Sequence, residues 1–256
     1  MPLVSSYTTL ALDLGNTALK YGVFTPAGLL ASGVLSEPAQ LGQLWQQQQP
    51  RHAILSSVVG EEVAQPWLAQ LAGKLPQVLP FRPGFTPVPL ANAYATPRTL
   101  GADRLAGAVG AASLRPGRAT LVLDVGTALK LDFIGADGTY YGGSIGPGLR
   151  MRLRALHEFT GRLPLLELPE VADEVQLIGT DTASSLRSGV ANGVVAEVLG
   201  LVASYQQHYP GLGLLLTGGD APWLLPRLTP TIKSIFAVPE LVLLGLDKIL
   251  RYNVED

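Results

Sequence analysis

The chain contains no cysteine, and this absence excludes several kinds of chemistry. Disulfides, thiolate metal sites and cysteine nucleophiles cannot form, and we expect a cytoplasmic protein because a reducing compartment suits such a composition. Charged residues are also few, at 15% of the chain, and the formal net charge is −2. The 18 basic residues are scattered, so we expect no nucleic-acid surface, which would need clustered lysine and arginine.

Other familiar signals are missing from the sequence. No uninterrupted apolar run reaches the ~20 residues that cross a bilayer, and the apolar stretch near the N-terminus leads into Asp13, so we expect neither a membrane partner nor a signal peptide. The three histidines, His52, His157 and His208, lie far apart without ligand spacing. The string GxxxxGK is absent, which excludes a P-loop, and no set of serine, histidine and acid stands within a recognisable triad motif, so we expect no triad hydrolase chemistry.

Length and composition predict two lobes and an oligomer. A chain of 256 residues is near the upper limit for one core and favours two domains of about 100 to 150 residues. Hydrophobic residues make up 47% of the chain, more than expected beside so few charges. We therefore expect part of the apolar excess to be buried between subunits, most simply in a homodimer.

The strongest positive signal is a short pattern that occurs twice, at residues 10–20 and 121–130. Each copy is an apolar strand that leads to an aspartate, turns on a glycine, offers a threonine and returns through a lysine. Aligning the copies needs one gap, at Asn16. We interpret the pattern as a phosphate-binding hairpin that has been duplicated.

The residue types of the first copy suit phosphate chemistry. Gly15 lets the backbone turn tightly, and Asn16 and Thr17 supply N–H groups in a concave turn. A carboxylate beside phosphate implies a divalent cation between them, so we expect Asp13 to hold Mg²⁺ through water and Lys20 to reach the terminal phosphates. An ordinary hairpin turn is the alternative for a single copy, because glycine, asparagine and aspartate favour turns.

The order of the remaining segments predicts an α/β fold. Strand patterns alternate with helical patterns, and six prolines between residues 76 and 97 favour an extended segment. The turn at residues 115–118 closes the first lobe, which predicts domains 1–117 and 118–256. Small residues from Leu105 onward predict a helix that packs closely on a neighbour, and a long helix is expected from Thr182 to about Tyr205.

Six motifs, in this order along residues 10 to 245, resemble those of the type III pantothenate kinase family of bacterial coenzyme A synthesis: DLGNTALK, GADR, DVGTALKLD, GGSIGPG, DTASSLRSGVANG and TGGDA. The resemblance implies the fold of the actin and sugar kinase superfamily, with two duplicated ribonuclease H-like domains, each with a mixed sheet, and an interdomain cleft for ATP. The first domain would carry the first hairpin and GADR, and the second the other hairpin and TGGDA.

The resemblance also implies site residues in the first domain. GADR would bind substrate, with Asp103 as the proton acceptor and Arg104 able to hold substrate carboxylate or phosphate oxygens. Tyr94 occupies the position of a substrate-contacting tyrosine, and a half-buried structural tyrosine is the alternative. For Asp103 and Arg104 the alternative is a helix cap with a surface ion pair. The implied ATP-binding residues are Asp13, Leu14, Gly15, Asn16, Thr17, Ala18, Leu19, Lys20 and Thr127, and the implied substrate-binding residues are Tyr94, Gly101, Ala102, Asp103, Arg104 and Thr182.

In the second domain the resemblance implies a monovalent cation, K⁺ or NH₄⁺, at Asp124. The chain departs from the family pattern at Lys130, where the family usually has threonine. That lysine could point to solvent or supply a positive charge near the cation site. Asp132 could be a hydrogen-bond acceptor outside the ligand shell or an ordinary aspartate at a strand end.

Three further features of the second domain allow two interpretations each. Thr182 resembles a pantothenate-binding threonine contributed across the dimer interface, but could be a helix N-cap in competition with Asp181. The glycines of TGGDA could let adenine and ribose lie against the backbone, or form a tight strand-to-helix turn. No aromatic residues are interleaved with the arginines at positions 150, 152 and 154. We therefore expect Arg150, Arg152 and Arg154 to lie on a solvated or interface helix face and not in a nucleic-acid patch.

The resulting hypothesis is an ATP-dependent kinase that converts pantothenate to 4'-phosphopantothenate, the first step of coenzyme A biosynthesis, as a homodimer with its active site near the interface. The alternatives are a non-catalytic regulator like the Bvg accessory factors of the same family, or a kinase of another small alcohol. Because a binding module would not need Asp13, Lys20, Asp103 and Asp124 together, these residues favour catalysis.

Overall fold

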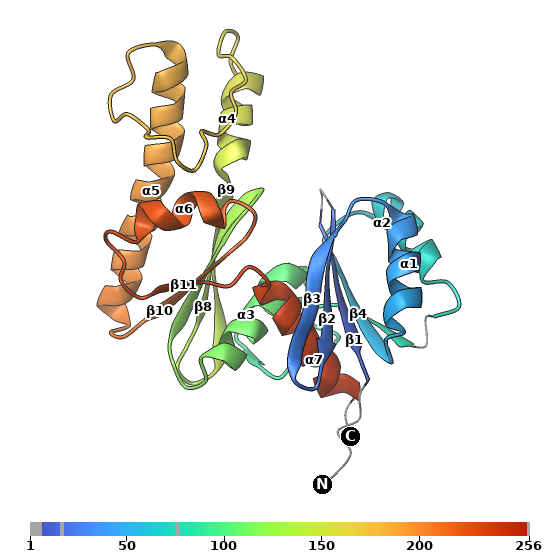
Figure 1. The fold of residues 1–256 in the computed structure, drawn as a ribbon. Coiled ribbons are helices and arrows are strands. Elements are labelled where there is room, and N and C mark those ends of the chain that lie inside the picture. The colour runs from blue at the N-terminus through green and yellow to red at the C-terminus, as the bar shows by residue number, and fades with distance from the viewer. Residues whose placement is uncertain (1–6, 16–17, 75–76, 255–256) are drawn as a thin grey trace. The chain divides into compact units, whose positions relative to one another are not determined.

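The computed structural model describes residues 7–15, 18–74 and 77–254, which form two compact units (Figure 1). Unit 1 comprises Met1–Gly117, Gly138–Tyr141 and Glu240–Asp256, and unit 2 comprises Arg118–Asp137 and Gly142–Pro239. The first change of unit falls at residues 117 and 118, the boundary between the predicted domains 1–117 and 118–256. The last helix, however, is grouped with unit 1, so the compact units and the predicted domains differ at the C-terminus.

Unit 1 contains a five-stranded mixed sheet in the order β3-β2-β1-β4-β5. The neighbours β1 and β2, and β2 and β3, are antiparallel, whereas β4 and β5 run parallel to β1. The strands are β1 (Thr9–Leu14), β2 (Leu19–Thr25), β3 (Gly28–Leu35), β4 (His52–Ser57) and β5 (Val78–Pro80), and the first helices are α1 (Pro38–Gln48) and α2 (Glu61–Gln70).

Alternation along β1 decides what each face of this sheet carries. Leu10, Leu12 and Leu14 are buried in one core cluster with residues of α1 and α2, including Trp45. Since successive side chains point to opposite faces, Asp13 lies on the other face of the strand. That face is packed by the C-terminal helix α7 (Leu241–Val254).

The second sheet has six strands, in the order β11-β10-β7-β8-β9-β6, and read from β9 to β11 its first five strands repeat the strand order of unit 1. Again the first two strands in sequence, β7 and β8, are antiparallel, and β10 and β11 run parallel to β7. The predicted α/β fold with duplicated mixed sheets is therefore confirmed. The elements are β7 (Thr120–Val125), β8 (Ala128–Ile134), β9 (Thr139–Pro147), β10 (Gly213–Thr217), β11 (Ile235–Ala237), α4 (Leu149–Glu158), α5 (Thr182–His208) and α6 (Ala221–Leu228).

The start of β9 belongs to unit 1. There Thr139 and Tyr140 pair in parallel with the short strand β6 (Ala91–Asn92). A 3₁₀ turn, η2 (Pro97–Thr99), follows β6 and leads to helix α3 (Ala102–Leu114). The proline-rich stretch is thus mostly irregular, as its composition predicts.

Helices α3 and α7 of unit 1 pack closely because glycines face backbone atoms on both sides. A Cβ built on Gly245 of α7 would overlap the carbonyl oxygen of Ala106, and one built on Gly110 of α3 would overlap that of Leu241. The prediction that the small residues of this helix allow a close neighbour is confirmed, and the neighbour is α7.

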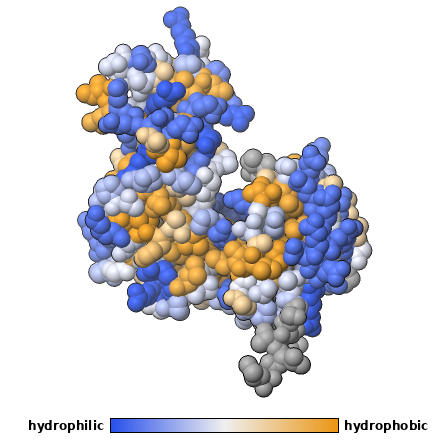
Figure 2. All heavy atoms as spheres, viewed as in Figure 1, coloured by the Kyte–Doolittle hydropathy of each residue, from blue (hydrophilic) through white to orange (hydrophobic). Residues whose placement is uncertain are grey.

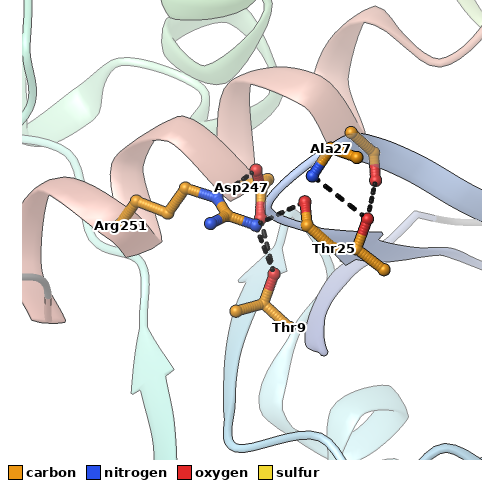
Figure 3. Close-up of polar contacts among 6 residues, drawn as sticks. Thr9, Thr25, Ala27, Asp247 and Arg251 are labelled. Carbon is orange, nitrogen blue, oxygen red and sulfur yellow. Dashed lines mark hydrogen bonds and ion pairs between the residues drawn. The ribbon is translucent and has the colours of Figure 1, made fainter. Parts of the chain in front are cut away.

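A buried polar network also holds α7 on the sheet (Figure 3). Thr9 Oγ1 donates to Asp247 Oδ1 at 2.6 Å, and Arg251 Nε donates to Asp247 Oδ2 at 2.8 Å. Arg251 Nη2 donates to the carbonyl oxygen of Thr25 at 3.1 Å. The Asp247 carboxylate is therefore paired despite its burial, which is the condition for a buried charge to be tolerated.

Helix α5 has 27 residues and, by length and composition alone, could cross a membrane. A single such helix is weak evidence, because core helices of soluble proteins meet the same criteria. One face of α5, including Val190, Val194 and Val198, is buried in the core of unit 2. In the most apolar 18-residue window of α5, only 28% is buried within the chain, so much of the helix surface is exposed or partly exposed.

The glycine contact between α3 and α7 predicts opposite effects for two alanine substitutions. Gly245→Ala should lower the free energy of unfolding by about 1 to 3 kcal/mol, because the added methyl overlaps backbone. Gly107→Ala, on α3, is the control, since its Cβ would meet nothing closer than Val242 Cγ2 at 4.0 Å. That change should leave stability unchanged or raise it by up to about 1 kcal/mol through helix propensity. Urea denaturation measures both, and equal effects would contradict the packing described.

Candidate active site

The two hairpins place an aspartate opposite a lysine in the same way. In unit 1 Asp13 is the cross-strand partner of Lys20, and in unit 2 Asp124 is the partner of Lys130. The first turn closes with the Gly15 N–H donating to the Ala18 carbonyl oxygen at 3.1 Å, and the second with Gly126 donating to Ala128 at 3.0 Å. The second turn is one residue shorter, as the gap in the sequence alignment predicts.

In unit 1 the row across the sheet continues to Ser56 of β4, which is the parallel partner of Asp13. Partners in register point to the same face, so Lys20, Asp13 and Ser56 are neighbours on one side of the sheet. Lys20 is exposed, Asp13 is half-buried and Ser56 is fully buried. The predicted site residues Asn16 and Thr17 lie outside the described residues.

This row fits the predicted Mg²⁺ held through water. The Ser56 hydroxyl is buried and makes no hydrogen bond among the described residues, although buried polar groups normally have a partner. An oxygen of this kind beside a carboxylate suits the water shell of Mg²⁺, which takes only one or two carboxylates from the protein and keeps several waters. Leu14 and Leu19 are buried in the core, so contact of either residue with a ligand would involve its backbone.

Sequence reasoning missed Ser56. The available signal was the pair of serines that ends an otherwise apolar strand, at residues 56 and 57. Without the register of β4 against β1, nothing indicated which serine shares the face of Asp13.

The GADR residues begin helix α3. Gly101 is the N-cap and Asp103 lies in the first turn, half-buried, so the alternative that Asp103 caps the helix is wrong. Arg104 is 6% exposed, which also rules out a surface ion pair. The Arg104 backbone N–H donates to Asp103 Oδ1 at 2.9 Å. The carboxylate therefore lies at the helix N-terminus, where a negative charge is favoured.

Tyr94 and Arg104 come together although ten positions separate them. The Arg104 guanidinium carbon lies 5.7 Å from the centroid of the Tyr94 ring, within the range of a cation–π contact. Tyr94 in turn stacks on Tyr140, with ring centroids 6.1 Å apart. Two of the residues predicted to bind substrate are thus neighbours in unit 1, and an aromatic partner supports them.

In unit 2 the Asp124 carboxylate is already paired with a cation from the chain. Lys130 Nζ lies 2.6 Å from Asp124 Oδ2, and the two side chains are only 15% and 18% exposed. Thr217 of β10 is the parallel partner of Asp124 on the other side. A monovalent metal ion does not fit beside this carboxylate while the ammonium group holds its position.

Two glycine-containing loops converge on the second hairpin. Gly148 donates its N–H to the Thr127 carbonyl oxygen at 3.0 Å, and a Cβ on Gly148 would overlap the carbonyl of Gly126. From TGGDA, Gly218 has φ +97° and its Cβ would overlap the carbonyl of Val125. GGSIGPG and TGGDA therefore both pack against this turn, and Thr127, within the turn, is exposed.

The three arginines of α4 have different partners. Arg150 forms an ion pair with the buried Asp220 of TGGDA, and Arg152 Nη2 lies 2.6 Å from Glu197 Oε2 of α5. Only Arg154, paired with Glu158 at 2.7 Å one helical turn away, is a simple solvated ion pair. A solvated face thus describes Arg154, whereas Arg150 and Arg152 tie α4 to the rest of unit 2.

The structure rules out a helix cap for Thr182 and a strand end for Asp132, and the functional roles of both residues stay predictions. Asp181, not Thr182, is the N-cap of α5: its Oδ1 accepts from the Ser184 N–H at 2.8 Å, and this bond lowers the pKa of Asp181. Thr182 is the first helical residue and is exposed. Asp132 lies inside β8 and is buried, so it is not an aspartate at a strand end.

Comparison with known proteins identifies the family. Residues 9–204 match the family model described as type III pantothenate kinase. A type III pantothenate kinase from Bacteroides fragilis is 39% identical over 246 residues, which cover 95% of this chain and 98% of that protein. One from Cytophaga hutchinsonii is 38% identical over 245 residues, covering 96% and 99%.

Solved structures share the fold at low identity. A protein from Sinorhizobium meliloti, provisionally assigned as a 2-dehydro-3-deoxygalactonokinase, superposes with a TM-score of 0.62 at 17% identity, covering 97% of this chain and 100% of that one. A Baf family protein from Campylobacter jejuni, provisionally assigned as a transcriptional activator, gives 0.60 at 18%, covering 95% and 98%. These likenesses confirm the predicted sugar-kinase-like fold and carry no information on activity.

The buried Ser56 hydroxyl predicts separable effects on stability and ligand binding. Ser56→Ala should keep or slightly raise the free energy of unfolding, because it removes a buried polar group without a described partner. It should weaken Mg·ATP binding by about three- to tenfold, since an ordered water loses a partner. Ser57→Ala, the adjacent and exposed position, is the control and should change neither. Calorimetric titration and urea denaturation measure the two quantities, and unchanged Mg·ATP binding would remove Ser56 from the site.

Proposed function

Because the chain belongs to the type III pantothenate kinase family, it is a kinase, and we propose that the residues described above transfer the γ-phosphoryl group of ATP to pantothenate. The product is 4'-phosphopantothenate, in the first step of coenzyme A biosynthesis. The observation that supports this most directly is the repeated hairpin, with an aspartate and a lysine in the same register in both units.

In the proposed reaction Asp103 is the proton acceptor. The terminal hydroxyl oxygen of pantothenate forms a bond to the γ-phosphorus, the bond from that phosphorus to the β–γ bridging oxygen breaks, and ADP leaves. The hydroxyl proton passes to the Asp103 carboxylate, which lies half-buried at the start of α3. Mg²⁺, when bound, supplies charge neutralisation of the phosphates.

Phosphate binding is assigned to the first hairpin. The half-buried Asp13 carboxylate and the Ser56 hydroxyl would hold the water shell of the divalent cation, and the exposed Lys20 would reach the terminal phosphates. Thr127, exposed in the turn of the second hairpin, is the proposed ATP contact of unit 2.

Substrate orientation is assigned to Arg104, Tyr94 and Thr182. The guanidinium of Arg104 is buried and lies within cation–π range of the Tyr94 ring, which restrains its position. A planar, preorganised guanidinium suits two parallel hydrogen bonds to the carboxylate of pantothenate. Thr182, whose hydroxyl does not cap α5, remains the proposed contact from unit 2.

For a monovalent cation, the family resemblance predicts K⁺ or NH₄⁺ at Asp124, and this part stays a prediction. The ion pair with Lys130 bears on it directly, because it places a positive charge where such an ion would bind.

A homodimer is supported by the exposed apolar surface of unit 2. The segment that joins α4 to α5 exposes Phe159, Leu177 and Ile178 by 83%, 81% and 76%. Figure 2 shows hydrophobic residues gathered at the end of unit 2 that carries this segment. Large exposed patches of this kind usually mark a protein interface.

The open face of α5 supports the same conclusion. Between residues 189 and 203 its exposed positions recur every three or four residues and carry only small side chains: Gly189, Gly193, Ala196, Gly200 and Ala203. At these three glycines a Cβ would meet no atom of the described residues within 4 Å. A row of small residues lets a second helix approach closely, as the glycines of α3 and α7 do within unit 1. We assign this face to the α5 helix of a second copy.

The regulator alternative is less well supported. The likeness to the C. jejuni Baf family protein, at 18% identity, concerns the fold, whereas the full-length relatives at 38 and 39% identity are type III pantothenate kinases. Two points support a cytoplasmic location. The chain belongs to a family of metabolic kinases, and the absence of cysteine suits a reducing compartment.

The role of Asp103 predicts a loss of turnover without loss of fold. Asp103→Asn should reduce kcat for pantothenate phosphorylation by about 10²- to 10⁴-fold, because the amide cannot accept the proton. ATP binding and the melting temperature should stay close to those of the unchanged protein. Asp137→Asn, in the exposed turn after β8, is the control and should retain full activity. A coupled ADP-release assay measures both, and full turnover by Asp103→Asn would exclude this base.

The dimer assignment predicts that a larger side chain on the open face of α5 separates the subunits. Gly193→Leu should stabilise the isolated helix by about 1 kcal/mol, because leucine has the higher helix propensity, yet shift the protein from dimer to monomer. Gln206→Leu, exposed on the same helix but away from the row of small residues, should leave the dimer intact. Sedimentation velocity measures the state of both, and an unchanged dimer in Gly193→Leu would place the interface elsewhere.

A further inference from the structure

We propose that the side chain of Lys130 serves as a built-in monovalent cation at Asp124, so that this kinase works without added K⁺ or NH₄⁺. The inference rests on the proposed kinase function and concerns the part of the site that unit 2 contributes. Its starting point is the ion pair in which Lys130 Nζ lies 2.6 Å from Asp124 Oδ2.

The backbone fixes this ion pair. Asp124 and Lys130 are direct partners in the antiparallel pairing of β7 and β8, so their side chains leave the same face of the sheet at adjacent points. Both side chains are mostly buried, at 18% and 15% exposure. The pair is therefore part of the folded hairpin and not a mobile contact at the surface.

The surroundings of Asp124 leave a free ion no equivalent place. Oδ2 is engaged by the ammonium, and Oδ1 faces Gly218, whose Cβ would lie 2.5 Å from it. The hydroxyl of Thr217, the partner of Asp124 on β10, donates to the carbonyl oxygen of Pro239 at 3.2 Å. A metal ion would have to displace the ammonium and then remain beside a like charge, which is unfavourable in a mostly buried site.

The lysine head group has the chemistry that the site requires. It is a substituted ammonium with three N–H donors and a compact charge, so it can serve Asp124 and further acceptors together. Because the ammonium group is covalently attached to the chain, no ion has to bind from solution. Lys20 has the same register in unit 1 but is exposed, whereas the Lys130 side chain is mostly buried.

The test compares the unchanged protein with Lys130→Thr, which carries the residue usual in the family, and with Lys130→Met, which keeps the length without the charge. Turnover of the unchanged protein should differ by less than about twofold between K⁺ and Na⁺ at equal ionic strength. Lys130→Thr should lose about tenfold or more in Na⁺ and recover in K⁺, and Lys130→Met should stay low in both. A fall of tenfold or more for the unchanged protein on replacing K⁺ by Na⁺ would overturn the proposal.

A readout that does not need turnover keeps this test separate from the kinase assignment. With Tl⁺ as a probe for K⁺, ²⁰⁵Tl NMR should show saturable binding to Lys130→Thr and none to the unchanged protein, and K⁺ should raise the melting temperature of that variant alone. Tl⁺ binding to the unchanged protein, or a folded Lys130→Thr without any response to K⁺, would refute the role of Lys130. Absence of pantothenate phosphorylation in every salt would instead refute the proposed function.

The matched control removes another ion pair of unit 2. Arg152→Met breaks the pair between Arg152 and Glu197, whose side chains are 23% and 36% exposed. It should lower the melting temperature without creating any difference between K⁺ and Na⁺. If Arg152→Met showed the same salt response as Lys130→Thr, the response would reflect general loss of stability, and the proposal would be wrong.

Discussion

The antiparallel pairing of two short strands is the constraint on which the rest of this molecule depends. In each unit it brings the aspartate at the end of one strand opposite a lysine on the next, and the adjacent parallel strand adds a hydroxyl residue to the same row, Ser56 in unit 1 and Thr217 in unit 2. Because hydrogen-bonded register fixes which side chains share a face, a slip of one residue in any of the three strands would turn the group on that strand to the other side. The apolar residues between them bury the opposite face, so packing and chemistry enforce the same register.

The two hairpins share their backbone pairing but differ in the surroundings of the aspartate and the lysine. In unit 1 the lysine is exposed, the serine is fully buried and the carboxylate is half-buried, the row to which we assign a hydrated divalent ion. In unit 2 the lysine closes on the carboxylate, and two glycine-containing loops pack against the turn. The two hairpins thus keep the same backbone pairing but differ in the exposure of their side chains and in the length of their turns. The shorter second turn is one such change.

Much of this arrangement could be predicted from the sequence, and the limits have physical causes. The apolar alternation with its terminal aspartate predicted both hairpins, and the small residues of α3 predicted a close helix neighbour. Sequence spacing could not show that this neighbour is α7, because the contact joins segments more than a hundred residues apart. Nor could it pair Arg150 with Asp220 or place Arg104 on the Tyr94 ring, since side-chain partners follow from packing between elements. Asp181 and Thr182 are both good caps, and only the backbone geometry chose between them.

The grouping of α7 with unit 1 has a consequence for how the protein is made. Translation delivers the strands of unit 1 first, then all of unit 2, and only afterwards the helix that covers Gly107, Gly110 and the buried face of β1. Until that helix emerges from the ribosome, α3 and the sheet present apolar surface with no cover, which is the condition under which nascent chains aggregate or recruit chaperones. The residues of unit 2 end at Pro239, so all of them have been translated before this helix is complete.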